Sequence, residues 1–130
     1  MDPERRLDRV RLLVVDDHAD SREAVSEFMA WHGADVVCAE SAAVALDLLS
    51  TRPVDVMVLD LDMPGMHGFE LIWRIRKTGN IVPAIAFSAL DDVAVREQAM
   101  EAGFQMFVPK PLEPLRLLRG IERLAAPPAS

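Results

Sequence analysis

The run Val56-Met57-Val58-Leu59 is short, entirely apolar and rich in β-branched valine, and Asp60 follows it directly. These features predict a β-strand buried on both faces, as in a parallel sheet that helices cover. Four further runs of the same kind lie at residues 12–15, 36–38, 84–87 and 106–108. The sequence therefore predicts five strands.

The segments between these runs carry apolar residues at helical spacing. Examples are Val44, Ala45, Leu48 and Leu49, and Leu117, Leu118, Ile121 and Leu124. Strands that alternate with helices in this way predict the doubly wound α/β class, in which helices cover both faces of a parallel sheet.

Three local signals predict where helices begin and end. Asp20 followed by Glu23 has the spacing of a capping box at the start of the first helix. Gly33 is placed to end that helix in a left-handed turn. Pro114 suits the first turn of the last helix.

The length of 130 residues and a hydrophobic content of 51% are enough for one domain with its own core. We expect an N-terminal lead over residues 1–10, the domain over 11–124, and a tail or truncated linker over 125–130. The formal net charge is −7 and the basic residues are scattered, which argues against direct binding of nucleic acid.

The single cysteine, Cys38, lies in an apolar run, so we expect a small buried side chain and no internal disulfide. No apolar run approaches the roughly 20 residues that span a bilayer, and the charged start lacks the apolar region of a secretion signal. The sequence therefore predicts a cytoplasmic protein that does not enter a membrane.

Polar residues follow the predicted strands at the edge where an open parallel sheet binds ligands. These residues are Asp16 and Asp17 after the first strand, Asp60 after the third, Ser88 after the fourth and Lys110 after the fifth. We expect the carboxylates, the hydroxyl and the ammonium to lie close together.

Each of these groups has a use in phosphoryl transfer. Clustered carboxylates repel one another unless a cation neutralises them, and oxygen ligands favour Mg²⁺, with Mn²⁺ as the alternative. The Asp60 carboxylate can act as the nucleophile and form an acyl phosphate. Lys110, Ser88 and backbone N–H groups can stabilise the oxygens of the transferred group.

These residues resemble the receiver domains of response regulators, which include the single-domain chemotaxis regulators. The resemblance covers roughly residues 11–124 and rests on four motifs in the same order. They are Leu-Val-Val-Asp-Asp ending at Asp17, the stretch from Val58 to Gly68, Ser88-Ala89, and Phe107-Val108-Pro109-Lys110-Pro111. The resemblance implies a flavodoxin-like sheet with strand order 2-1-3-4-5 and five helices.

The family also implies site roles and partners. Asp60 would take a phosphoryl group from a phosphohistidine of a sensor histidine kinase or a histidine phosphotransfer protein. Mg²⁺ would be held by Asp17, Asp60 and the backbone carbonyl of Asp62, with Asp16 acting partly through a water. Phosphorylation would draw Ser88 inward, let the Phe107 ring turn in from the surface, and alter a face that binds partners or a second copy of the chain.

Simpler interpretations exist for single residues. Asp16 and Asp17 alone would suit a turn and helix cap, and Lys110 alone would suit a solvated loop. His18, His32 and His67 show no ligand spacing among themselves, which argues against a zinc site.

Two other functions compete with the receiver interpretation. Asp60-Leu61-Asp62 mimics the nucleophile motif of haloacid-dehalogenase phosphatases, but that class places the pair after its first strand. A pseudo-receiver would act only as a binding module, although such domains typically lack the acceptor or the acidic pair. Whether the chain is a stand-alone protein or part of a larger one stays open, because its Pro-containing stretches also resemble receivers attached to hybrid kinases.

Overall fold

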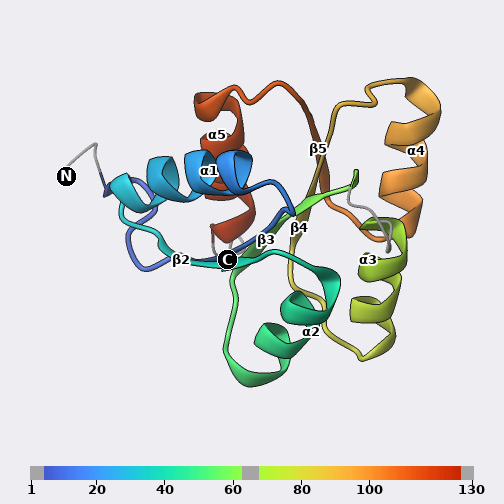
Figure 1. Ribbon diagram of the computed structural model, residues 1–130, viewed down its shortest axis with the longest axis horizontal. Helices are drawn as coiled ribbons and strands as arrows, with labels where there is room; N and C mark the ends of the chain where they lie inside the picture. The colour runs from blue at the N-terminus through green and yellow to red at the C-terminus, as the bar shows by residue number, and fades with distance from the viewer. Residues whose placement is uncertain (1–4, 63–67, 127–130) are drawn as a thin grey trace.

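The computed structural model describes residues 5–62 and 68–126, in which five strands alternate with five helices (Figure 1). The elements are β1 (Arg11–Val15), α1 (Ala19–Trp31), β2 (Asp35–Ala39), α2 (Ala42–Thr51), β3 (Val56–Asp60), α3 (Gly68–Lys77), β4 (Ala84–Ser88), α4 (Val93–Ala102), β5 (Met106–Pro109) and α5 (Pro114–Ala125). The five predicted strands are confirmed, each extended by one or two residues.

The strands form one parallel sheet in the order β2-β1-β3-β4-β5, which confirms the predicted fold class and strand order. Helices α1 and α5 cover one face, and α2, α3 and α4 cover the other (Figure 1). Every residue of β3 and β4 is buried, as expected for central strands between two helical layers.

Two of the three helix signals act as predicted. Gly33 has φ +97° and follows the end of α1, and Pro114 is the first residue of α5. The capping box is wrong, because α1 starts earlier than that motif requires. His18 occupies the N-cap position without a side-chain cap, and Asp20 lies inside the first turn, where its charge favours the helix dipole.

Part of the predicted N-terminal lead packs against the domain. Leu7 is fully buried, and its backbone N–H donates to the His32 carbonyl oxygen at 2.9 Å. Arg6 forms an ion pair with Glu122 of α5 at 2.7 Å. Leu7 therefore belongs to the core that α1 and α5 cover, and the partly buried Val10 packs against it.

The expectation that Cys38 is buried is wrong. Cys38 lies on β2, which is an edge strand of the sheet and is only partly covered by helices. Its Sγ lies 2.8 Å from the Ser26 hydroxyl oxygen. In the described part of the chain, no helix combines the length and the apolar character needed to cross a bilayer.

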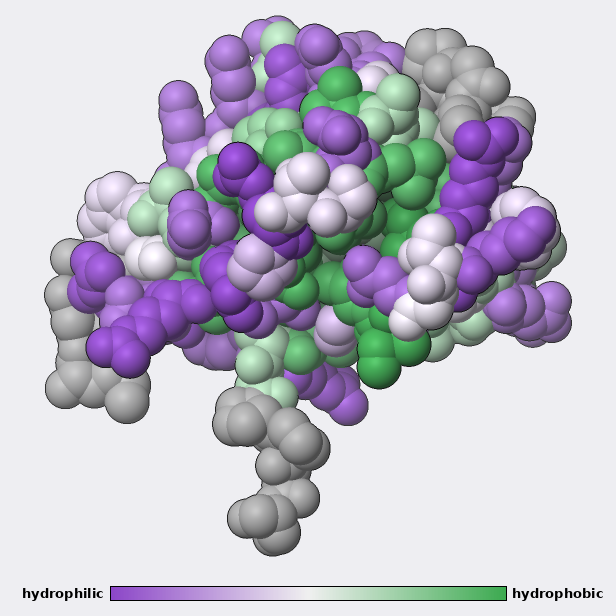
Figure 2. Space-filling model, turned by 90° about the horizontal axis from the view of Figure 1, so that it is seen from below, coloured by the Kyte–Doolittle hydropathy of each residue, from purple (hydrophilic) through white to green (hydrophobic). Residues whose placement is uncertain are grey.

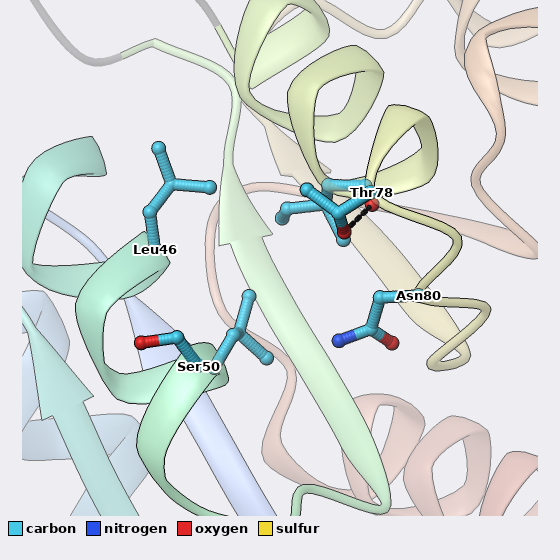
Figure 3. A pocket seen from close by; sticks show the side chains of 6 residues that line it. Leu46, Ser50, Thr78 and Asn80 are labelled. Carbon is cyan, nitrogen blue, oxygen red and sulfur yellow. Dashed lines mark hydrogen bonds between the residues drawn. The ribbon is translucent and has the colours of Figure 1, made fainter.

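A hollow of about 180 Å³ lies between the C-terminal ends of α2 and α3. Leu46 and Ser50 of α2 line one side of it, and Thr78 and Asn80 line the other (Figure 3). Figure 2 shows apolar side chains gathered at the centre of the face seen from below. The residues that line the hollow carry no ionisable group, and it lies at the end of the sheet opposite Asp60.

Candidate functional site

The register of the sheet brings the predicted site residues to one edge. Val15 pairs with Leu59, so Asp16 and Asp60 follow neighbouring positions on β1 and β3. Asp60 pairs with Phe87, the residue before Ser88. Ser88 in turn pairs with Pro109, and Lys110 follows. The parallel pairing thus collects groups that lie far apart in the sequence.

Asp60 is 1% exposed at the end of β3. Its Oδ1 accepts hydrogen bonds from Lys110 Nζ at 3.0 Å and from the Asp62 backbone N–H at 2.9 Å. Its Oδ2 is buried and has no hydrogen-bond partner among the described residues. One oxygen is therefore held in place, and the other is available to a cation or a reacting group. The peptide bond between Lys110 and Pro111 is cis.

The two carboxylates after β1, those of Asp16 and Asp17, differ in their hydrogen bonding. Asp16 is 2% exposed, and its Oδ1 accepts a hydrogen bond from the His18 backbone N–H at 2.9 Å. Burial raises the pKa of Asp16, the His18 N–H lowers it, and the nearby Asp60 charge raises it further. In the described structure, Asp17 Oδ1 is buried without a hydrogen-bond partner.

A divalent cation fits this arrangement. Asp17 Oδ1 and Asp60 Oδ2 are buried oxygens whose desolvation no hydrogen bond within the described chain offsets. Oxygen ligands of this kind suit Mg²⁺ or Mn²⁺. His18 Nδ1 lies 3.5 Å from Asp17 Oδ1, so one histidine borders the site. This proximity was not predicted from the sequence, although the direct succession Asp17-His18 could have indicated it.

The hydrogen-bond partners of the Asp62 side chain are a part of the site that the sequence did not predict. In the structure its carboxylate accepts hydrogen bonds from Ser88 Oγ at 2.9 Å and from the Ala89 backbone N–H at 3.1 Å. Ser88 is fully buried, and its Oγ also accepts a hydrogen bond from the Leu90 backbone N–H at 3.0 Å.

The Phe107 ring already lies inside the protein. The residue is 9% exposed, and the Arg96 guanidinium lies 5.1 Å from the centre of its ring. From the sequence, we expect the ring to reach this position only after phosphorylation. The structure therefore differs from the expected resting arrangement of Phe107.

Gly68 allows α3 to begin directly beside the acceptor strand. A Cβ atom at this position would lie 2.9 Å from Leu61 Cα and 3.3 Å from the Asp60 backbone oxygen. A larger residue would displace the backbone that carries Asp60. Residues 63–67 of the predicted motif, including His67, lie outside the described residues.

Comparison with known proteins gives concordant results. The family model described as the response regulator receiver domain matches residues 12–122. The chain is 39% identical over 126 residues to an "Uncharacterized 14.6 kDa protein in sodA1 3'region" of Leptolyngbya boryana, covering 94% of this chain and 96% of that protein.

A second relative and a solved structure agree. The chain is 35% identical over 121 residues to the response regulator MprA of Mycobacterium sp. (strain KMS), covering 91% of this chain and 53% of the relative. It thus spans about half the length of that relative. The Francisella response regulator 1452 receiver domain superposes with a TM-score of 0.87 at 27% identity, covering 90% of this chain and 97% of that one.

Proposed function

The chain belongs to the response-regulator receiver family, and from this premise we propose that Asp60 accepts a phosphoryl group from a phosphohistidine in a Mg²⁺-dependent reaction. The observation that carries the proposal is the environment of the Asp60 carboxylate. The carboxylate is buried, one oxygen is held by Lys110 at 3.0 Å, and the other has no hydrogen-bond partner in the described structure.

In the proposed reaction, an Asp60 oxygen forms a bond to phosphorus while the bond between phosphorus and the donor's imidazole nitrogen breaks. The Lys110 ammonium lies where it can neutralise charge on the transferred oxygens, and the Ser88 hydroxyl can donate a hydrogen bond to them. Asp17 and Asp60, with the Asp62 backbone carbonyl, would hold Mg²⁺, and Asp16 would bind through a water. A bound Mg²⁺ would offset the repulsion between the carboxylates and the phosphoryl oxygens.

The partners we propose follow from family membership. The donor is a sensor histidine kinase or a histidine phosphotransfer protein, and phosphorylation can favour pairing of two copies of the chain. We propose that the protein works in the cytoplasm as a signalling phosphoacceptor that promotes only its own phosphorylation and dephosphorylation.

The order of the site residues speaks against the phosphatase alternative. An acidic pair follows β1, and Asp60 follows β3, whereas haloacid-dehalogenase phosphatases carry the nucleophile after their first strand. The retained acceptor, acidic pair and lysine argue in the same way against a pseudo-receiver. Steady turnover of a phosphomonoester would restore the phosphatase alternative.

The test is the intact mass of the protein after incubation with acetyl phosphate. We expect one added phosphoryl group in the presence of Mg²⁺, and none in excess chelator or in Asp60→Asn. A phosphoryl group that forms equally well in Asp60→Asn would refute Asp60 as the acceptor, and one that forms equally well in excess chelator would refute the dependence on Mg²⁺.

A further inference from the structure

The Asp62 carboxylate lies against the hydrogen-bond donors and the ammonium that the proposed reaction needs for the phosphoryl oxygens. Its Oδ1 accepts from Ser88 Oγ at 2.9 Å, and its Oδ2 accepts from the Ala89 backbone N–H at 3.1 Å. The same Oδ2 lies 3.8 Å from Lys110 Nζ. A hydroxyl, an amide and an ammonium therefore converge on an anion supplied by the chain itself.

Ser88 cannot serve Asp62 and a phosphoryl group at the same time. A serine hydroxyl has one hydrogen to donate, and Ser88 gives it to Asp62 while accepting from the Leu90 backbone N–H at 3.0 Å. Ser88 is fully buried, so water offers no alternative acceptor. Donation from Ser88 to a phosphoryl oxygen requires that the bond to Asp62 break.

The two ends of this contact differ in their freedom to move. The Asp62 side chain is 32% exposed, whereas the Asp60 side chain is 1% exposed. The Asp62 backbone is tied to the acceptor by its N–H, which donates to Asp60 Oδ1 at 2.9 Å. The Asp62 carboxylate can therefore turn toward solvent while its backbone stays beside Asp60.

We propose that Asp62 is an internal stand-in for the phosphoryl group. Before phosphorylation its carboxylate holds Ser88, Ala89 and Lys110 in the arrangement that a phosphoryl group on Asp60 would impose, and phosphorylation displaces it. This inference rests on the proposed function. It adds that the Asp62 carboxylate competes with the phosphoryl group for Ser88 and Ala89. It also accounts for the buried Phe107 ring, which lies inward while Ser88 is already engaged.

Two measurable consequences follow. Removing the Asp62 carboxylate strengthens binding of a phosphoryl group, because Ser88 and Ala89 no longer have to be released from an existing partner. Removing it also frees Ser88 and the Ala89 N–H in the protein without phosphoryl. An Asp62 that serves only to order its loop would produce neither effect.

The first measurement is the dissociation constant of beryllofluoride, a phosphoryl analogue that binds a carboxylate oxygen, in saturating Mg²⁺. We expect Asp62→Ala to bind about tenfold more tightly than the wild type, equivalent to about 1.4 kcal/mol. Asp62→Asn keeps a neutral acceptor and should fall between them, because charge-assisted hydrogen bonds are roughly twice as strong as neutral ones. Glu40→Gln is the matched control, since Glu40 is an exposed acid after β2 at the same edge of the sheet.

The second measurement is the amide NMR spectrum before and after beryllofluoride is added. In the wild type, the Ala89 N–H is already bonded to an anion, so its resonance should change little. In Asp62→Ala the free protein should show a displaced Ala89 resonance with faster hydrogen exchange, and beryllofluoride should return it toward the wild-type position.

The outcomes separate this inference from the proposed function. If beryllofluoride binds Asp62→Ala no more tightly than the wild type, the stand-in role is refuted and the phosphoacceptor role remains. An affinity gain of equal size in Glu40→Gln would also refute it, because net charge alone would then explain the effect. If beryllofluoride binds none of the variants, the phosphoacceptor role fails and the stand-in role fails with it.

Discussion

Lys110→Met should destabilise the metal-free protein, because it leaves the buried Asp60 carboxylate without its cationic partner. The Lys110 Nζ to Asp60 Oδ1 distance is 3.0 Å. At this distance and an effective dielectric constant of about 20, two unit charges attract by about 5.5 kcal/mol. The folded variant no longer has to desolvate an ammonium at this position, so measured costs of removing one partner of a buried pair are lower, at about 3–5 kcal/mol.

The Lys110 side chain is 20% exposed, which favours the lower part of the range. We therefore expect a loss of about 3 kcal/mol, or about 10 °C in Tm for a domain of this size.

The assay is urea denaturation in excess chelator at pH 7, with unfolding monitored by circular dichroism. Fluorescence should report unfolding weakly, because Trp31 and Trp73 are already 62% and 57% exposed in the folded protein. In an Asp60→Asn background, Lys110→Met should cost less than about 1 kcal/mol, since no buried charge remains at position 60. Lys77→Met is a control that should also cost less than about 1 kcal/mol, because Lys77 stacks on the exposed Trp73 ring. Equal losses in both backgrounds would show that the Lys110–Asp60 attraction does not stabilise the fold.

Three further outcomes are expected. Asp17→Ala should weaken Mg²⁺ binding in a calorimetric titration more than Asp16→Ala does, because Asp17 holds an unpartnered buried oxygen, and the reverse order would exchange their roles. Gly68→Ala should lower the free energy of unfolding by about 1–3 kcal/mol and reduce phosphorylation of Asp60, whereas unchanged urea curves would contradict the close approach at Gly68. Hydrogen bonds from Arg11 hold the pKa of Asp55 below its ordinary value of 3.8, so the stabilisation is present above pH 3.8 and is lost as the pH falls through the lowered value. The Tm difference between wild type and Asp55→Asn should therefore be largest at pH 7 and disappear in acid. A Tm difference that persists at pH 2 would contradict this.

The pattern of apolar runs determined the strands and the fold class. A parallel sheet between helical layers needs strands that are apolar on both faces, and this local property is visible in runs such as residues 56–59. The same pattern predicted where Asp60, Ser88 and Lys110 would meet, because parallel strands carry their carboxyl ends to one edge. The motif resemblance supplied the strand order, which the periodicity alone left open.

Only the tertiary structure decided which side chains find partners from other elements. Cys38 lies in an apolar run but is exposed, because the position of β2 at the sheet edge is not encoded in the run itself. Leu7 belongs to a charged segment but is fully buried, because α1 and α5 together form its site. The Asp62 carboxylate meets Ser88 across 26 positions of sequence, and that contact depends on how the chain after β3 lies against the end of the adjacent strand β4. Local sequence specifies which face of an element is apolar, whereas a hydrogen bond between elements requires the position and direction of both groups, and folding alone supplies these.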